Sequence, residues 1–151
     1  MPTEFKIIPS ERLKLVRISG RADYAELEAC FYRYIRHPDF SPDFRVLVDL
    51  RDLTDAIGGL WEFQKVKNLY QYAYAEAESA FDVVLLTQGN AAYRAARLFA
   101  FLMRDRKPMH VRVTKNLDEA LQILGVKPEV VHPFLPMANA TDVIPLAQFR
   151  S

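Results

Sequence analysis

Two compact apolar runs constrain the fold more than any other feature of the sequence. They are Arg45–Leu50 and Phe81–Leu86, and valines and leucines make up most of each run. Because they do not alternate apolar with polar residues, they are typical of strands covered on both faces, as in a parallel sheet. Each run precedes a helical pattern, over Leu60–Glu78 and Ala91–Arg106. Strands that alternate with helices predict an α/β fold.

Three further runs complete a predicted sheet of five strands. Phe5–Ile8 and Leu13–Ile18 are separated by a turn at Pro9, which predicts an antiparallel hairpin. Leu13–Ile18 alternates imperfectly, as in a strand with one wetter face. Met109–Thr114 is the last strand, and Arg51–Gly59 is expected to be a loop. The sheet is therefore expected to be mixed and mostly parallel, with helices packed on it.

Capping residues mark the first and last predicted helices. Asp23 begins the first helix, and Glu26 stands three residues later, which is the spacing of a capping box. Pro38 ends this helix, because the residue before a proline disfavours the helical conformation. The last helix covers Leu117–Leu124, with Gly125 as the residue just beyond its end.

The sequence pattern changes after Gly125. Residues 126–151 contain four prolines and show no regular period, yet they include several large apolar side chains. A disordered tail is poorer in such residues. We therefore expect one α/β domain over residues 1–125 and an extended C-terminal arm over 126–151, which packs on the domain or on a dimer mate.

Composition excludes several classes of protein. The chain has 151 residues, 20 basic and 19 acidic side chains and one cysteine, Cys30. A formal charge of +1 favours no nucleic-acid partner. The sequence lacks an apolar run of the roughly 20 residues that cross a bilayer, and its first residues lack the apolar core of a secretory signal. We expect a cytoplasmic protein without membrane insertion and without an internal disulfide.

Chemistry-bearing residues do not assemble into a known catalytic pattern. Asp49, Asp52 and Asp55 follow a buried strand, where α/β proteins place ligands. Arg51 lies among them and can neutralise one carboxylate, so turn formation explains them better than a metal site does. The three histidines lack zinc-ligand spacing, and Cys30 is expected to be a packed thiol. We expect no enzyme, no metal and no cofactor.

Two loops could bind a small ligand. Gly58 and Gly59 precede one helix, and the turn from Thr87 to Asn90 precedes the next, with Asn90 as a candidate N-cap. Free amide groups at such helix starts attract anions. Arg94 and Arg97 follow within two turns. The loops over residues 51–59 and 87–90 are therefore the expected site of an alternative function, a carrier or sensor of a small apolar or anionic ligand.

Aromatic residues on the outward faces of two helices predict an interface. A helical projection separates these residues from the core stripes, and arginines accompany them. Aromatic residues with arginine are typical of interface centres. The expected interface residues are Trp61, Tyr72, Tyr93, Arg97, Phe101 and Arg104. A homodimer is the expected partner, and a regulatory protein is the alternative.

The order of elements and three segments resemble the SpoIIAA-like group of the STAS-domain superfamily. The segments are His37–Phe40, the Val46–Leu50 strand with its Asp-Leu ending, and Asp118–Leu121. The resemblance covers about residues 5–125. It implies a stand-alone bacterial interaction or regulatory module without catalytic activity. The related lipid-binding folds of the CRAL-TRIO type imply the alternative of a lipid-like ligand.

The same resemblance places a regulatory position in this chain. In the sporulation antagonist, a phosphorylated serine at the start of the helix after this strand switches partner binding. The corresponding position falls near Gly58 and Gly59, which carry no hydroxyl, and Thr54 is the nearby hydroxyl. The resemblance therefore implies the fold without the phosphorylation switch.

Overall fold

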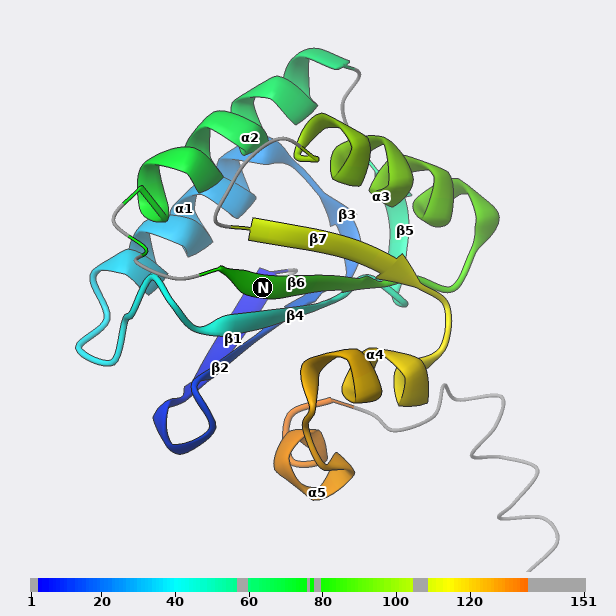
Figure 1. Ribbon diagram of the computed structural model, residues 1–151. Coiled ribbons are helices and arrows are strands. Elements are labelled where there is room, and N and C mark those ends of the chain that lie inside the picture. The colour runs from blue at the N-terminus through cyan, green and yellow to red at the C-terminus, as the bar shows by residue number, and fades with distance from the viewer. Residues whose placement is uncertain (1–2, 57–59, 76, 78–79, 105–108, 136–151) are drawn as a thin grey trace, which may run out of the picture.

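The computed structural model describes residues 3–56, 60–75, 77, 80–104 and 109–135, and a five-stranded sheet lies at its centre (Figure 1). The sheet has the strand order β1-β2-β4-β6-β7. β1 pairs with β2 in the antiparallel direction, and all other neighbours are parallel. The predicted mixed, mostly parallel sheet is confirmed. The strands are β1 (Thr3–Ile8), β2 (Leu13–Ile18), β4 (Arg45–Asp49), β6 (Phe81–Leu86) and β7 (Met109–Thr114).

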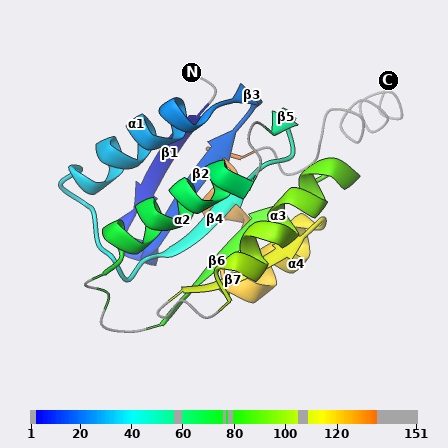
Figure 2. The same ribbon diagram turned by 90° about the horizontal axis from the view of Figure 1, so that it is seen from above.

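Helices cover both faces of this sheet. One side, here called the three-helix face, carries α1 (Tyr24–Ile35), α2 (Leu60–Ala73) and α3 (Asn90–Leu102), which lie next to one another in Figure 2. The other side, the α4–α5 face, carries α4 (Leu117–Leu124) and α5 (Pro128–Val131). Within the described part of the chain, no helix is both long and apolar enough to cross a membrane.

The two faces bury different side chains. Aromatic rings and valines fill the three-helix face, with the rings coming from Phe31, Tyr34, Tyr70, Tyr74, Phe81 and Phe99. Leucines and valines fill the α4–α5 face, and they come from β2, β4, β6, α4 and the segment after it. The sheet is thus buried on both sides, as the continuous apolar runs predict.

Local chemistry sets several helix ends where the sequence predicts them. Asp23 Oδ1 accepts a hydrogen bond from the backbone N–H of Glu26 at 2.9 Å and caps α1. Gly125 follows α4 with a φ of +66°, a left-handed conformation that favours glycine. α2 and α3 end at Ala73 and Leu102, earlier than the predicted Glu78 and Arg106.

A second, two-stranded sheet was not predicted. β3 (Gly20–Ala22) pairs in parallel with β5 (Leu53–Ala56). The expectation of a loop throughout 51–59 is therefore wrong at 53–56. Gly20, with a φ of +65°, turns the chain out of β2, and its N–H donates to the carbonyl of Asp52 at 2.9 Å. The pairing joins segments far apart in the sequence, so neither segment carries a strand pattern of its own.

The expected wetter face of β2 is also wrong. Leu13, Lys14, Leu15 and Val16 are all buried. β2 lies between β1 and β4, and helices cover it from both sides. Its alternation therefore separates two buried layers, with Leu13 and Leu15 on the α4–α5 face and Val16 on the three-helix face.

The segment after Gly125 differs from the expected extended arm in its first part. Residues Pro128–Val131 form the short helix α5, and a proline suits its first turn because that position needs no N–H donor. Val126, Val131 and Leu135 are buried on the α4–α5 face. The rest of the predicted arm, 136–151, lies outside the described residues.

Candidate functional site

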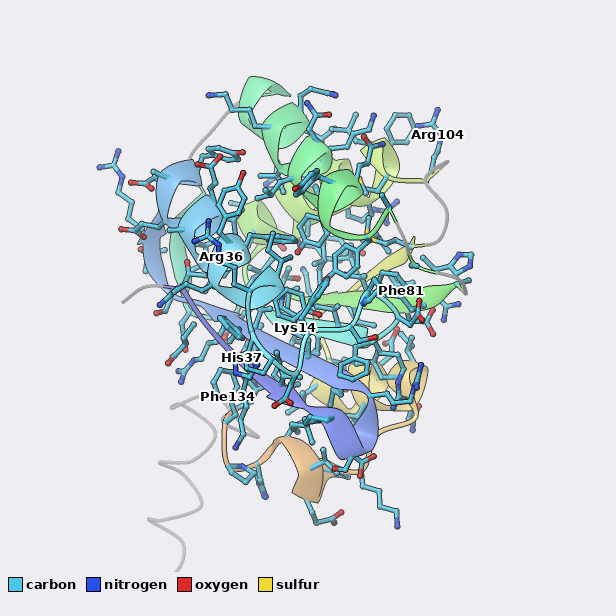
Figure 3. All side chains as sticks on the ribbon, turned by 90° about the vertical axis from the view of Figure 1, so that its left-hand side faces the viewer. Lys14, Arg36, His37, Phe81, Arg104 and Phe134 are labelled. Atoms are coloured by element: carbon cyan, nitrogen blue, oxygen red, sulfur yellow. The ribbon has the colours of Figure 1, made fainter. Side chains whose placement is uncertain are left out.

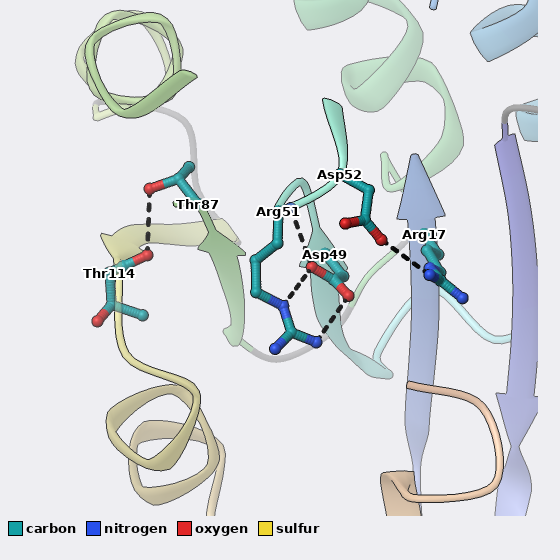
Figure 4. A network of polar contacts seen from close by, with 6 residues as sticks. All are labelled: Arg17, Asp49, Arg51, Asp52, Thr87 and Thr114. Atoms are coloured by element: carbon teal, nitrogen blue, oxygen red, sulfur yellow. Dashed lines mark hydrogen bonds and ion pairs between the residues drawn. The ribbon is translucent and has the colours of Figure 1, made fainter. Parts of the chain in front are cut away.

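Polar side chains gather where the parallel strands end, at the carboxyl edge of the sheet (Figure 4). β4 ends at Asp49, which exposes 1% of its surface. Arg51 donates two side-chain hydrogen bonds to the Asp49 carboxylate, with Nε 2.9 Å from Oδ1 and Nη2 3.0 Å from Oδ2. The backbone N–H of Arg51 also donates to Oδ1 at 3.0 Å. This planar, two-pronged pair compensates the burial of the charge.

A second ion pair lies beside the first and is wetter. Arg17 Nη2, on β2, is 2.8 Å from Asp52 Oδ2, and the two side chains expose 28% and 50% of their surfaces. This hydrogen bond raises the pKa of Arg17 above its ordinary value. Arginines therefore hold two of the three carboxylates of the predicted acidic loop, while the side chain of Asp55 lies outside the described residues.

Thr87 directly follows β6 at the same edge of the sheet, and its side chain points into the protein interior. It is fully buried, and its hydroxyl donates to the carbonyl of Thr114 at 3.3 Å. The Thr114 hydroxyl in turn accepts from the backbone N–H of Asn116 at 3.1 Å. These threonine hydroxyls tie β6, β7 and the start of α4 together. Thr87 was expected to face a ligand, but its hydroxyl is committed to this interior network.

Three of the other expected ligand-binding residues, Asn90, Arg94 and Arg97, are on α3. Gly89, rather than Asn90, is the N-cap of α3, and Asn90 Oδ1 accepts from Lys115 Nζ at 2.8 Å. The predicted N-cap role of Asn90 is therefore wrong, because the helix begins one residue earlier than expected. Arg94 and Arg97 are exposed on α3. Gly58 and Gly59 lie outside the described residues.

Among the residues that the structure describes, no three His, Cys, Asp or Glu side chains are grouped so as to hold a metal ion. At the carboxyl edge of the described sheet, arginine and threonine partners satisfy the hydrogen-bonding groups of the strand ends. These contacts stabilise the edge.

A cavity of about 290 Å³ lies at the opposite, amino edge of the sheet. Charges of both signs line it, from Arg12, Asp43, Arg45, Ala80, Phe81 and Asp82. The Arg45 guanidinium donates to the backbone carbonyls of Leu124 and Glu11. Arg45 therefore joins the β1–β2 turn to the end of α4, and the cavity is remote from the loops predicted to bind a ligand.

The expected interface residues differ in how much of each side chain is exposed. The side chain of Trp61 lies outside the described residues. Tyr72, on α2, exposes 72% of its surface. Tyr93 is only half-exposed, because Arg97 donates to its hydroxyl at 3.4 Å and Lys115 Nζ lies 4.7 Å from its ring centre.

A continuous exposed line runs along the outer face of α3. We call it the α3 stripe, and it consists of Arg94, Arg97, Leu98, Phe101 and Arg104. Leu98 and Phe101 expose 40% and 56% of their surfaces. The Arg104 guanidinium lies 3.8 Å from the centre of the Phe101 ring and donates to the Phe101 carbonyl at 2.9 Å.

The helical projection of the sequence also places Leu98 on the core face of this helix, with Phe99 and Met103, and this prediction is wrong. The buried side of α3 consists of Ala96, Phe99 and Met103. Alanines are only weakly apolar, so an alanine-rich helix does not define its buried face sharply. The predicted core face was therefore rotated by about one residue from the observed one. Phe99 and Met103, four residues apart, were the usable signal, and Leu98 lies to the side of them.

Lys14 is a candidate functional residue that the sequence did not indicate. It exposes 2% of its surface within the three-helix face. A lysine flanked by Leu13 and Leu15 is usually read as the solvent side of an edge strand. The available signal was the topology, because a hairpin followed by a parallel strand can place β2 inside the sheet rather than at its edge.

Comparison with known proteins bears on the fold. A crystal structure of an uncharacterized DUF3478-family protein from Shewanella loihica PV-4, described as having a SpoIIAA-like fold, is similar to this chain. The TM-score is 0.51 at 16% sequence identity, over 81% of this chain and 91% of that chain. This chain has a SpoIIAA-like fold. No family model matches the sequence, and no curated protein matches it either.

Proposed function

We propose that this chain is a non-catalytic protein-interaction module that self-associates through the α3 stripe. The exposure of Phe101 and Leu98 carries the proposal, because these residues leave 56% and 40% of their surfaces open on a helix whose other side is buried. They lie one helical turn apart, so they form a single apolar spot. Such a spot, rimmed by polar groups, is typical of a surface that another protein covers.

The order of side chains along the stripe favours a second copy of this chain as the partner. Arg94 and Arg97 occupy its amino-terminal half, and Leu98 and Phe101 occupy its carboxyl-terminal half. If two copies of α3 pack antiparallel, with a two-fold axis between positions 97 and 98, each Phe101 faces the partner's Arg94. A guanidinium on an aromatic ring contributes about 0.5–2 kcal/mol. Two-fold symmetry forms this contact twice.

Arg104 prepares the ring for this contact. Its guanidinium already lies on Phe101 in the single chain, 3.8 Å from the ring centre. A side chain that is ordered before binding loses less conformational entropy on docking. The partner's arginine is expected to use the ring surface that Arg104 leaves open.

The carboxyl edge supports the non-catalytic part of the proposal. Arg51 holds the buried Asp49, and Arg17 holds Asp52. A general acid or base needs a carboxylate within reach of a substrate, and the carboxylate of Asp49 is buried. The alternative, a carrier of a small apolar or anionic ligand, stays a prediction, as does the absence of a phosphorylation switch at residues 58 and 59.

Sedimentation tests the proposed self-association. The wild-type chain is expected to be a dimer at tens of micromolar in analytical ultracentrifugation, and Phe101→Glu is expected to be a monomer with unchanged helical content. Loss of a central aromatic anchor typically weakens binding by more than tenfold. Gln122→Glu, on the exposed side of α4, is the matched control and is expected to stay dimeric. A monomeric wild type at this concentration contradicts the proposal.

Cross-linking tests the position of the axis. Leu98 is next to the proposed two-fold axis, so Leu98→Cys is expected to form a disulfide-linked dimer under mild oxidation. Gln122→Cys, far from the axis, is expected to remain uncross-linked. The native cysteine, Cys30, is buried and does not compete. If Gln122→Cys cross-links as fast as Leu98→Cys, the pairing through α3 is wrong.

A further inference from the structure

A lysine occupies an interior position of the three-helix face. Lys14 is on β2, the second strand of the sheet, and exposes 2% of its surface. Figure 3 labels it inside the molecule. Its neighbours across the strands are Ile7 on β1 and Val46 on β4, so the sheet supplies no charged group at this level. Lysines are almost never fully buried unless they are paired.

Aromatic rings, rather than a carboxylate, surround the Lys14 ammonium. Nζ lies 3.4 Å from the ring centre of Tyr34 and 4.7 Å from that of Phe31, and both rings come from α1. No ion pair joins Lys14 to a carboxylate among the described residues. The rings attract the cation, and most strongly where water is excluded. That attraction is smaller than the free energy lost when an ammonium leaves water.

Burial therefore lowers the pKa of Lys14 from its ordinary value of 10.5 to about 7, although the nearby Cys30 acts in the opposite direction. The other titratable groups of this layer move the other way. Burial raises the pKa of Cys30, of Tyr34 to about 12, and of Tyr70 on α2 and Tyr74 just after it still further. Lys14 is thus the group of this layer whose pKa moves toward neutral pH.

The helix that supplies the two rings is at the border of the sheet. α1 contacts α2 and β1, and β1 is an edge strand. The backbone ladders that join β2, β4, β6 and β7 do not include α1, so opening of this helix would leave the central pairing in place. Its departure removes Phe31 and Tyr34 from Lys14 and lets water reach the ammonium. Arg33 is a charged side chain of α1 that lies beside Cys30 and acts on its pKa. It is not among the causes of the pKa shift of Lys14, so it does not favour the open or the closed arrangement through Lys14.

We propose that Lys14 is a proton-controlled latch for α1: the helix opens with uptake of a proton by Lys14 and closes when the proton is released. The two arrangements bind protons differently, because the closed form buries the amine and the open form hydrates it. Any group that titrates differently in two states makes their equilibrium depend on pH.

The sign and size of the dependence follow from the two pKa values of Lys14, about 7 in the closed form and 10.5 in the open form. Above 10.5 the amine is neutral in both forms, and the closed form is favoured most. As the pH falls toward 7, the open form gains protons, and the opening constant rises by up to about tenfold per pH unit. Between pH 8 and pH 7 the increase is about fivefold, and below pH 7 the constant levels off.

Hydrogen exchange of the full chain, followed by mass spectrometry and corrected for intrinsic rates, measures the opening of α1 directly. The opening constant of α1 peptides is expected to rise about fivefold from pH 8 to pH 7 in the wild type. Lys14→Met is expected to abolish this dependence. Lys6→Met, an exposed lysine on β1, is the matched control and is expected to keep the wild-type slope. Amides of α4, on the other face, report whether the response is confined to α1.

Three results overturn the latch: a flat wild-type profile, the same slope in Lys14→Met, or an equal slope in α1 and α4. If Lys14→Met does not fold, a carbon-13 NMR titration of the lysine side chains in the wild type decides. A Lys14 resonance that titrates near pH 7 supports the latch, and one that titrates near 10.5 contradicts it.

Discussion

The three-helix face and the α4–α5 face share the same strands, yet they bury different chemistry. Phe31, Tyr34, Tyr70 and Tyr74 form edge-to-face and stacked contacts on the first, with ring centres 4.6 Å to 6.3 Å apart. The second consists of leucines, valines and an alanine, and its buried set contains no aromatic ring among the described residues. The strands alternate between the two layers residue by residue.

This difference decides which layer can hold a charge. An aromatic ring presents a negative face, so the first layer can attract an ammonium. An aliphatic layer offers no such attraction, and a lysine there would lose all its hydration without compensation. Neighbours on one strand show the contrast, because Lys14 faces the rings and Leu15 faces the leucines. The stability of the first layer is thus expected to depend on pH, and that of the second is expected not to respond to it.

Removing the end of the second layer is expected to have the largest effect. A chain truncated after Gly125 loses Val126, Val131 and Leu135, which are all buried. At about 2 kcal/mol for each buried side chain, the free energy of unfolding is expected to fall by about 6 kcal/mol. Urea denaturation measures it, with Lys127→Ala in the exposed part of the same segment as the unchanged control. Equal stability of the truncated and full chains would show that this segment is not part of the core.

Substitutions at adjacent positions of β2 sharpen the contrast between the layers. Lys14→Met is expected to raise the free energy of unfolding by about 4 kcal/mol at pH 7, because it removes the buried amine. The gain is expected to shrink as the pH rises and to vanish near 10.5, where the amine is neutral in both states. Leu15→Ala is expected to lower the free energy of unfolding by about 3 kcal/mol at every pH. Urea denaturation at pH 7 and pH 10 decides, and parallel pH profiles for the two variants would refute the contrast.

The smallest expected effects concern the carboxyl edge, where both layers end. Arg51→Ala leaves the buried Asp49 carboxylate without its charged partner and is expected to cost about 3 kcal/mol of stability. Asp52→Ala removes the exposed partner of Arg17 and is expected to cost less than about 1 kcal/mol. Thermal denaturation of both variants provides the measurement. A larger loss in Asp52→Ala would mean that burial does not control the strength of these pairs.

The features that the sequence predicted correctly rest on local or strongly periodic signals. The runs at Arg45–Leu50 and Phe81–Leu86 predict strands buried on both faces, because three or four apolar residues stand consecutively in each. Asp23 and Gly125 acted where expected, since a cap depends on the few residues around it. These elements are sufficient to derive the mixed, mostly parallel sheet.

The features that were missed depend on partners far away in the sequence. β3 and β5 become strands only because they pair with each other. Lys14 is buried because β1 and α1 enclose β2, and its residue type alone indicates solvent. Leu98 was assigned to the wrong side of α3 because alanines leave the phase of the helix undefined. The hydrogen bond from the Thr87 hydroxyl to the Thr114 carbonyl was not predicted either, because it depends on the order of β6 and β7.

The order in which the α4–α5 face is completed has a consequence for synthesis. Leu13, Leu15 and Leu47 leave the ribosome early, whereas the side chains that cover them belong to residues 117–135. During translation the sheet can form with its three helices while its other surface is a bare sheet of leucine and valine. The nascent chain is therefore expected to bind chaperones through this surface, and to aggregate most readily, just before α4 and α5 emerge.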